Sequence, residues 1–495
     1  MKLKISQAKC SPSSSESPDN LPQPRGGTED HSNPYKSVGY PWRSDDTIYI
    51  MLNEARNVFI VGIKGVGMAN LALILKKMGK SVVGSDTDEE FITSENLKRN
   101  NITTFVGFNT SFIPSNTDLL IYSAAHRGIE NPQVQFALQN NIRVLHQAEV
   151  LAQLMDMHEI KIAVCGSHGK TTTSALLAYC LKQLGQNPTY MVGTSSFNSF
   201  PGGDYGDGKY IVVEADEYAI DPPRDTTPKF HKLRPDYVIC TNIDFDHPDV
   251  FKDLDDVKKA FTVFFDNVNT RIYACEKDKS LMSVLATVPK EKYTLYGQHD
   301  KDFEIGIPGA KNRLNALGVR QLLIDLGFKD DEIVVPFKNF TGAKRRFEQV
   351  AYENDIYLFD DYAHHPNEIR ATIEAARSRF NDRRIIVIFQ PHTYTRTAAL
   401  RQDFVHSLAK ADVSFVAPIF ASAREKENGQ TITSRDLEQY AHEQGIENIH
   451  SFETQEELFG KLQQNLHPGD IIFTMGAGDI YKLKSDIIEV IRKAK

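Results

Sequence analysis

The chain has 495 residues, and its 57 basic side chains against 65 acidic ones give a formal net charge of −8. This balance disfavours proteins that hold nucleic acids or anionic membranes through a general basic surface. Hydrophobic residues make up 41% of the chain and charged residues 25%, as in soluble globular proteins, so the chain as a whole is not disordered. At about 100 to 200 residues per domain, the length predicts about three domains.

The apolar stretches and the cysteines exclude further classes of protein. The longest apolar candidate, residues 58–75, is interrupted by Lys64, Asn70 and glycines, and it falls short of a membrane span. The five cysteines form no CxxC pair, which argues against a disulfide framework or a zinc ribbon. We therefore expect a soluble, cytoplasmic protein.

The N-terminal segment, residues 1–47, differs in composition from the rest. It is rich in Ser, Pro and Gly and has few apolar residues to bury, so we predict a disordered tail. No apolar h-region follows Lys2 and Lys4, which excludes a signal peptide.

A first module is predicted over residues 48–155. The β-branched run 57–62 ends in glycines and is followed by an amphipathic pattern over 68–78, and further strand patterns cover 81–86 and 117–123. Strand, helix and strand at this spacing predict a parallel sheet.

The first strand ends in a glycine-rich turn formed by Gly62, Gly65 and Gly67, and Asp86 follows about 20 residues later. The spacing is G-x-x-G-x-G, and Asn70 stands where the dinucleotide fingerprint has its third glycine. The motif therefore favours a nucleotide diphosphate at a helix N-terminus over NAD. The alternative hypothesis, an NAD-dependent oxidoreductase, has this motif as its only support in the sequence.

A second module is predicted over residues 156–335, with buried strands near 161–165, 210–214, 236–242 and 271–275. Between the first of these strands and an apolar helix lies the run Gly166, Ser167, His168, Gly169, Lys170, Thr171 and Thr172. Backbone N–H groups, a lysine and a hydroxyl at a helix N-terminus suit a polyphosphate with Mg²⁺. Val164 stands where the full Walker A pattern has glycine, so the loop is a shortened variant.

Acidic side chains follow the next strands of this module. Glu214, with Asp216 and Glu217 nearby, ends one strand, and His247 follows another. Mg²⁺ prefers oxygen ligands and needs few protein carboxylates beside nucleotide phosphates. Glu214 is our candidate ligand, and the position of His247 at the same sheet edge is compatible with a metal, a phosphate or a structural role.

A third module, residues 336–495, carries strand patterns near 356–361, 384–389, 413–418 and 470–475. Arg345 or Arg346, near its start, is placed to cross a domain cleft to a phosphoryl group. Polar loops after two of its strands, residues 360–368 and 390–397, predict a binding face at one sheet edge. Each feature is also compatible with solvated charges or helix capping.

The ordered set of motifs resembles the Mur ligases of peptidoglycan synthesis over residues 55–490. The motifs begin at Gly166, Glu214, Asn242, Asn312, Gly342, Asp360 and Gln390. The resemblance implies an α/β protein of three tandem domains with mostly parallel sheets: a Rossmann-like UDP-sugar domain, a P-loop ATPase domain and a Rossmann-like amino-acid domain.

The resemblance also implies the chemistry. It is strongest to the members that use ATP and Mg²⁺ to join L-alanine to UDP-N-acetylmuramate through an acyl phosphate. The implied partners are small molecules, with no nucleic acid and no membrane, and the implied state is a monomer or weak homodimer.

Site residues follow from the resemblance position by position. Lys170, Glu214 and His247 are assigned to catalysis, and Thr171, Glu214 and His247 to the metal. The nucleotide is assigned to the loop residues Gly166, Ser167, His168, Gly169, Lys170, Thr171 and Thr172 and to Asn312, Arg346 and Asp361. The substrates are assigned to Gly65, Gly67, Ser123, His365, His392 and Arg396.

Two departures leave the amino acceptor open. Thr393 stands where the alanine-adding members commonly have arginine, and the segment after Glu214 is longer than expected and resembles ligases that recycle L-alanyl-γ-D-glutamyl-meso-diaminopimelate. The glycine-rich run 475–479 favours alanine. A non-catalytic nucleotide-binding regulator is a further alternative, against which the intact Lys170, Glu214 and His247 argue.

Overall fold

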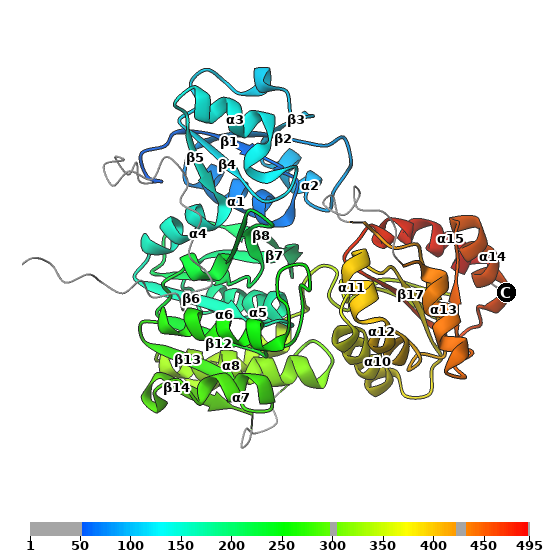
Figure 1. The fold of residues 1–495 in the computed structure, drawn as a ribbon. Helices are drawn as coiled ribbons and strands as arrows, with labels where there is room; N and C mark the ends of the chain where they lie inside the picture. Colours follow the sequence, from blue (N-terminus) through cyan, green and yellow to red (C-terminus); the bar gives the residue numbers. More distant parts are fainter. Residues whose placement is uncertain (1–51, 298–303, 422–431, 494–495) are drawn as a thin grey trace, which may run out of the picture. The chain divides into compact units, whose positions relative to one another are not determined.

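The computed structural model describes residues 52–297, 304–421 and 432–493. The predicted N-terminal tail lies outside these residues. Within them the chain forms α/β modules, called here the first, central and third modules, each built on its own sheet (Figure 1).

The first module has a parallel sheet of order β3-β2-β1-β4-β5. Helices α1, α2 and α4 cover one face of this sheet and α3 covers the other. The strands are β1 (Asn57–Val61), β2 (Ser81–Asp86), β3 (Thr103–Val106), β4 (Leu119–Tyr122) and β5 (Arg143–His146), and the helices are α1 (Val66–Lys77), α2 (Ser94–Arg99), α3 (Pro132–Gln139) and α4 (Gln147–Asp156).

The central module contains a larger sheet of order β14-β13-β12-β6-β9-β7-β8, parallel except for β8. Its strands are β6 (Ile160–Cys165), β7 (Thr189–Phe197), β8 (Phe200–Asp204), β9 (Tyr210–Glu214), β12 (Tyr237–Cys240), β13 (Arg271–Cys275) and β14 (Tyr293–Tyr296). Its helices are α5 (Lys170–Gln183), α6 (Leu254–Asp266), α7 (Lys279–Leu285), α8 (Ala310–Asp325) and α9 (Asp330–Asn339). A separate hairpin, β10 (Ala219–Asp221) and β11 (Asp225–Pro228), follows β9. Helix α9 spans the predicted domain boundary at residues 335 and 336, which stays a prediction.

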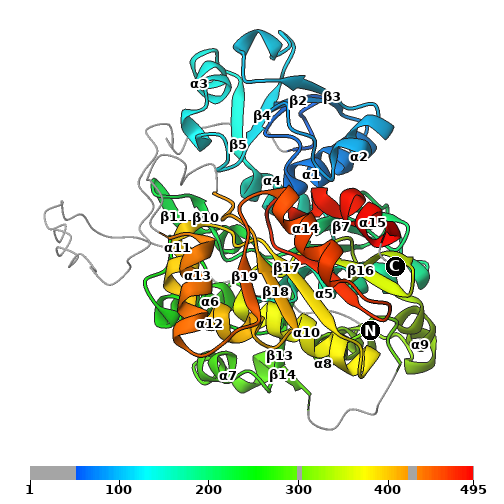
Figure 2. The ribbon, with the colours of Figure 1, turned by 90° about the vertical axis from the view of Figure 1, so that its right-hand side faces the viewer.

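The third module has a sheet of order β15-β16-β20-β17-β18-β19, parallel except for β15. Its strands are β15 (Glu348–Glu353), β16 (Ile356–Asp361), β17 (Ile385–Phe389), β18 (Val413–Val416), β19 (Ile449–Ser451) and β20 (Ile471–Met475). Its helices are α10 (Pro366–Phe380), α11 (Tyr394–Ala399), α12 (Arg401–Leu408), α13 (Ser434–Glu443), α14 (Gln455–Asn465) and α15 (Lys484–Lys493). Figure 2 shows β17, β18 and β19 with α13 and α14 beside them.

Strand β17 shows why the parallel strands are apolar without interruption. Ile385, Val387 and Phe389 pack with α10, α12 and α13, whereas Ile386 and Ile388 pack with α14 and α15 on the other face. Both faces of this strand are therefore buried, so neither set of alternating residues is polar.

Asn70 explains why the glycine motif of the first module departs from the dinucleotide fingerprint. Its side chain is fully buried on α1 and donates to the carbonyls of Val192 (2.7 Å) and Thr194 (2.9 Å) on β7 of the central module. Glycine at this position would leave both carbonyls without that donor. The residue therefore joins two modules, and one hydrophobic cluster runs through α1 and the central sheet.

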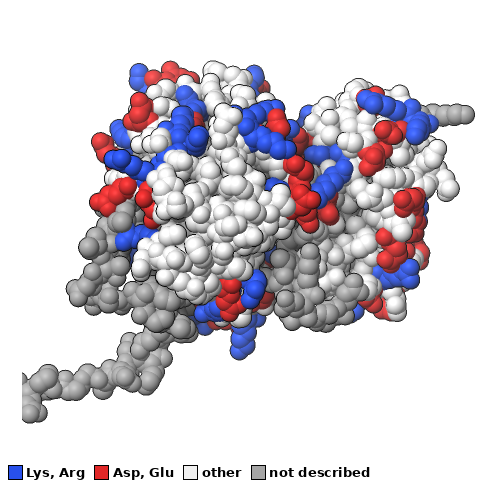
Figure 3. Space-filling model, turned by 90° about the horizontal axis from the view of Figure 1, so that it is seen from above, with Lys and Arg blue, Asp and Glu red and all other residues white. Residues whose placement is uncertain are grey.

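Further features of the fold are the length of its described helices and the distribution of charge on one face of the molecule. None of the described helices is both long and apolar enough to cross a lipid bilayer. On the face in Figure 3, acidic and basic side chains lie interspersed.

Candidate functional site

The loop between β6 and α5 has the backbone that the shortened phosphate-binding motif predicts. Gly166 and Gly169 both have positive φ, at 128° and 85°. A Cβ at Gly166 would lie 2.2 Å from Thr241 Oγ1, and one at Gly169 would lie 2.5 Å from Asn315 Nδ2. Only glycine fits these positions, because both the backbone conformation and the space exclude a side chain.

Lys170 begins α5 and folds back over this loop. Its Nζ donates to the carbonyl of Gly166 (2.7 Å) and forms an ion pair with Glu217 Oε2 (2.7 Å). Burial alone would lower the pKa of Lys170, but Glu217, Asp216 and Glu214 together raise it. The side chain is therefore a cation held at the loop that would receive a phosphate.

Thr171 and Glu214 meet beside this lysine. Thr171 Oγ1 donates to Glu214 Oε2 (3.2 Å), and Arg346 Nη2 of the third module donates to Thr171 Oγ1 (3.2 Å). A Cβ at Gly193 would lie 2.7 Å from Glu214 Oε2, so the backbone closes tightly around the carboxylate. A hydroxyl and a carboxylate are ligands that suit Mg²⁺, so these residues fit the predicted metal.

His247 lines the same cavity as Thr171 and Glu214. Its Nδ1 lies 3.5 Å from Arg396 Nη2, and its Nε2 lies 3.8 Å from Asp246 Oδ2. The residue has a left-handed backbone (φ 59°), which few non-glycine residues adopt. Its assignment to the metal stays a prediction.

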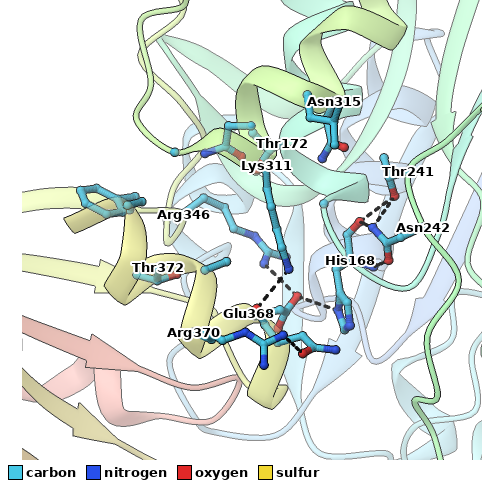
Figure 4. Close-up of a pocket in the computed structure, with 18 of the residues that line it drawn as sticks. His168, Thr172, Thr241, Asn242, Lys311, Asn315, Arg346, Glu368, Arg370 and Thr372 are labelled. Carbon is cyan, nitrogen blue, oxygen red and sulfur yellow. Dashed lines mark hydrogen bonds and ion pairs between the residues drawn. The ribbon is translucent and has the colours of Figure 1, made fainter. Parts of the chain in front are cut away.

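A different trio in the described residues has metal-ligand geometry: His168, Asp244 and His365. His168 Nε2 lies 3.0 Å from Asp244 Oδ2, and its Nδ1 lies 3.4 Å from Glu368 Oε1 (Figure 4). Burial alone would lower the pKa of His168, but the two carboxylates raise it to about 9. His168 and the two carboxylates therefore form an ion-pair network, and the ring of His365 packs beside His168.

One cavity lies between the phosphate loop, α8 and α10 (Figure 4). Asn312 and Thr172, both predicted nucleotide residues, line it with Arg346 and Asp361. Asn312 Nδ2 donates to the carbonyl of Pro308 (2.6 Å). Burial raises the pKa of Asp361 to about 6 although Arg346 lowers it. Most side chains that line this cavity are polar or charged, and Ile307, Leu314 and Phe347 add apolar surface.

The two arginines at the start of the third module have different environments. Arg345 is buried within that module, where its Nε donates to Asp360 Oδ2 (3.2 Å) and its Nη2 donates to the carbonyl of Gly476 (2.6 Å). Arg346 contacts Thr171 in the central module. Of the two candidates for crossing to the phosphoryl group, Arg346 is therefore the one that reaches the phosphate loop.

Arg396 is only 4% exposed and is paired with Asp246 of the central module. Its Nε and Nη2 lie 2.8 Å and 2.7 Å from Asp246 Oδ1. His365 caps α10, and its Nε2 lies 3.2 Å from the carbonyl of Phe245. His392 is half-buried and stacks on Phe420. These three predicted substrate residues stay predictions, and two of them contact the central module.

The predicted sugar-nucleotide residues lie at the carboxyl edge of the first sheet. Gly65 precedes α1, and a Cβ at Gly67 would lie 2.6 Å from Gln147 Nε2. Ser123 follows β4, and its Oγ accepts the N–H of Ala125 (3.4 Å). Sequence reasoning missed His126, whose Nε2 lies 3.4 Å from Asp86 Oδ1.

A second cavity reaches all three modules. Gly67 lines it from the first module, Lys170 and Glu214 from the central module, and Arg346 and His364 from the third. Sequence reasoning also missed Glu368, which contacts His168 and His364. The acid three residues after His365, in a capping-box position, was a signal for its placement.

The chain is similar to known proteins over most of its length. Three family models match: the Mur ligase family catalytic domain (residues 57–159), the Mur ligase middle domain (164–307) and the Mur ligase glutamate ligase domain (345–478). A UDP-N-acetylmuramate–L-alanine ligase of Desulfitobacterium hafniense is 36% identical over 460 residues, covering 87% of this chain and 99% of that protein. A ligase of the same name from Lactobacillus acidophilus is 36% identical over 457 residues, covering 87% and 98%.

Solved structures share the fold. The UDP-N-acetylmuramate-alanine ligase of Thermotoga maritima has a TM-score of 0.71 at 24% identity, covering 89% of this chain and 100% of that one. A murein peptide ligase of Psychrobacter arcticus has a TM-score of 0.68 at 22% identity, covering 88% and 99%. With consecutive domain matches and relatives this similar over nearly their whole length, the chain belongs to the Mur ligase family.

Proposed function

We propose that the protein joins L-alanine to UDP-N-acetylmuramate in an ATP-dependent reaction of peptidoglycan precursor synthesis. The observation that carries this proposal is the cavity that all three modules line, from Gly67 through Lys170 and Glu214 to His364. A ligase that brings together a sugar nucleotide, ATP and an amino acid needs such a meeting point. The relatives cited above carry the name of this activity.

In the proposed reaction the lactyl carboxylate takes the γ-phosphoryl group of ATP and ADP leaves. The alanine amine then attacks the acyl phosphate, which releases phosphate and a proton and forms the amide. Lys170 and the N–H groups from Gly166 to Thr172 hold the phosphates, where preorganised charge stabilises the transferred group. Thr171 and Glu214 hold Mg²⁺ with His247, and Arg346 adds a cation from the third module. Asn312 and Asp361 bind the nucleoside in the adjoining cavity.

The residues that bind the UDP-sugar and the amino acid are proposed from their positions in the structure. Gly65, Gly67 and Ser123 hold the UDP-sugar at the first sheet edge. His365, His392 and Arg396 serve the amino acid, and the guanidinium of Arg396, which pairs with Asp246 in this structure, binds its carboxylate.

A tripeptide acceptor is the alternative, favoured by the long segment after Glu214. Alanine is preferred because the relatives at 36% identity carry the alanine ligase name.

One assay tests the proposal. The full chain is incubated with ATP, Mg²⁺ and UDP-N-acetylmuramate, together with L-alanine, glycine, L-serine or the tripeptide, and phosphate and products are measured. We expect phosphate release that requires both the UDP-sugar and an amino acid, with L-alanine the best acceptor. Tripeptide ligation with negligible alanine turnover would instead support the recycling activity, and nucleotide binding without phosphate release would support a regulator.

A further inference from the structure

The long segment after Glu214 forms a hairpin that is fixed at its base. Lys229, just after β11, forms an ion pair with Asp216 (2.8 Å), and its N–H donates to the carbonyl of Tyr218 (2.9 Å). The base of the hairpin therefore stays beside the catalytic strand end, whereas its tip extends to a different module.

The tip contacts residues 127–130 of the first module. Asp221, which is fully buried, accepts the N–H of Ile129 (3.3 Å), and Arg224 Nη2 donates to the carbonyl of Arg127 (2.9 Å). Arg224 also pairs with Glu130 (3.1 Å). A Cβ at Gly128 would lie 2.3 Å from Asp221 Oδ1, so the two modules meet here without a gap.

Arg224 and Asp221 also bind each other. Arg224 Nε donates to Asp221 Oδ2 (3.0 Å), and its Nη2 donates to Oδ1 (2.9 Å). This two-point geometry fixes the guanidinium, since both N–H groups are committed to one carboxylate. We call the Asp221–Arg224 pair the clamp.

The segment under the clamp has an unfavourable backbone. His126 and Arg127 have φ values of 53° and 75°. The left-handed region is unfavourable for a non-glycine residue, and such conformations persist where the surroundings hold them. The clamp provides that support, because it binds the backbone directly after these two residues.

The same segment places His126 over the glycine loop of the first module. His126 Nε2 lies 3.4 Å from Asp86 Oδ1, and its ring would lie 3.0 Å from a Cβ at Gly62. Gly62 and Asp86 belong to the motif that predicts a nucleotide diphosphate. Support for the backbone at residue 127 therefore also sets where His126 lies at that site.

We propose that Asp221 and Arg224 are positioning residues that hold the 126–130 segment over the UDP-sugar site and so set the affinity for the UDP-sugar. This inference rests on the proposed function for the identity of the ligand. The proposal assigns the hairpin a role in binding the sugar nucleotide. The hairpin is distant in sequence from every residue that we predict to contact this ligand.

The first test is Arg224→Ala in the full chain, with Kd values for UDP-N-acetylmuramate and for ATP with Mg²⁺ measured by calorimetry. We expect the Kd for the UDP-sugar to rise about tenfold and that for ATP to change less than about twofold. The control is Arg234→Ala, an arginine of the same module that donates to the carbonyls of His231 and Leu233. An unchanged UDP-sugar Kd in Arg224→Ala, or equal losses for both ligands with a lower Tm, would overturn the proposal.

The second test adds Arg127→Gly to Arg224→Ala. Glycine adopts φ near 75° without the penalty of a side chain, so the double variant should regain about threefold or more in UDP-sugar affinity. Arg127→Gly alone is measured to correct for any direct contact of this exposed side chain. No recovery would overturn the role of the clamp in supporting the backbone. Wild-type protein that binds ATP but not the UDP-sugar would refute the proposed function itself, a result distinct from all of these.

Discussion

Lys170 is held in the phosphate loop by several partners within the protein. Its ammonium already contacts the loop carbonyls and Glu217, so a phosphate would compete with existing partners for it. In the proposed reaction this charge lies where the transferred phosphoryl group develops negative charge.

We predict that Lys170→Ala lowers the ligation rate by roughly a hundredfold or more, because it removes a preorganised cation from the transition state. The rate of phosphate release measures this loss, and circular dichroism checks that the fold is kept. Lys161→Ala, which removes an exposed pair with Asp156, serves as the control. Near-wild-type turnover of the Lys170 variant would refute the phosphate assignment.

We predict that alanine substitutions of Arg345 and Arg346 change different properties, the first stability and the second catalysis. Arg345→Ala leaves Asp360 buried with fewer donors and should lower stability by about 3 kcal/mol, seen as a lower urea midpoint. Arg346→Ala should instead raise the KM for ATP and lower kcat, with a small change in stability, since this side chain is partly exposed at the loop. The reverse pattern would contradict the two environments described above.

The raised pKa of His168 predicts that the stability of the fold changes with pH. Its pKa is raised to about 9 in the folded chain from an ordinary value near 6.5, so its ion pairs stabilise fully below pH 6.5 and are lost as the pH rises through 9. The Tm of the wild type should therefore fall more steeply between pH 7 and pH 10 than that of His168→Gln. Parallel Tm profiles for the two proteins would show that the imidazole is not protonated by its neighbours.

At the scale of elements, α1 contributes to the predicted nucleotide site and also to the contact with the central module, and each role requires different residues. Its N-terminus carries the glycine motif, and its middle carries Asn70 against β7 of the central module. Gly202 and Gly203 on β8 leave room for this approach, since a Cβ at either would lie within 2.6 Å of atoms of Asn70.

We predict that Asn70→Ala destabilises the chain by about 1–3 kcal/mol, because two buried carbonyls lose their donor. Urea unfolding measures this loss. Asn100→Ala, at an exposed helix end of the same module, is the control and should change stability by less than about 0.5 kcal/mol. Equal effects of the two substitutions would show that the bonds of Asn70 to β7 contribute nothing specific.

At the scale of the whole molecule, the central module meets the third through residues that follow β6 and β12. The third module reaches the central one through Arg346, Arg396 and Asn367, which bond to Thr171, Asp246 and Asp244. Because these bonds connect the proposed nucleotide and amino-acid residues, we expect the ligation rate to depend on how the two modules are joined.

Deletion of residues 1–47 should leave the Tm and the ligation rate nearly unchanged. The segment has few apolar side chains to contribute to a core, so its removal takes little from the free energy of folding. Thermal melting and the alanine assay measure both quantities. A large loss of either would show that the segment docks on the enzyme.

The amino-acid sequence alone determined the α/β class, the parallel sheets and the phosphate loop, because these depend on local patterns. Apolar runs such as 385–389 predict strands buried on both faces, and Gly169, Lys170 and Thr171 at a strand-to-helix turn predict a phosphate cradle. The same reasoning placed Glu214 at the end of its strand beside that loop.

Only the tertiary structure decided which groups meet across modules. Neighbouring arginines have the same local pattern, yet Arg345 is buried against Asp360 and Arg346 reaches Thr171, 175 residues away in sequence. His168 acquires its charge from Asp244 and Glu368, and Arg224 binds the backbone of Arg127. The physical reason is that burial and Coulomb interactions depend on distance in space, which local periodicity does not encode.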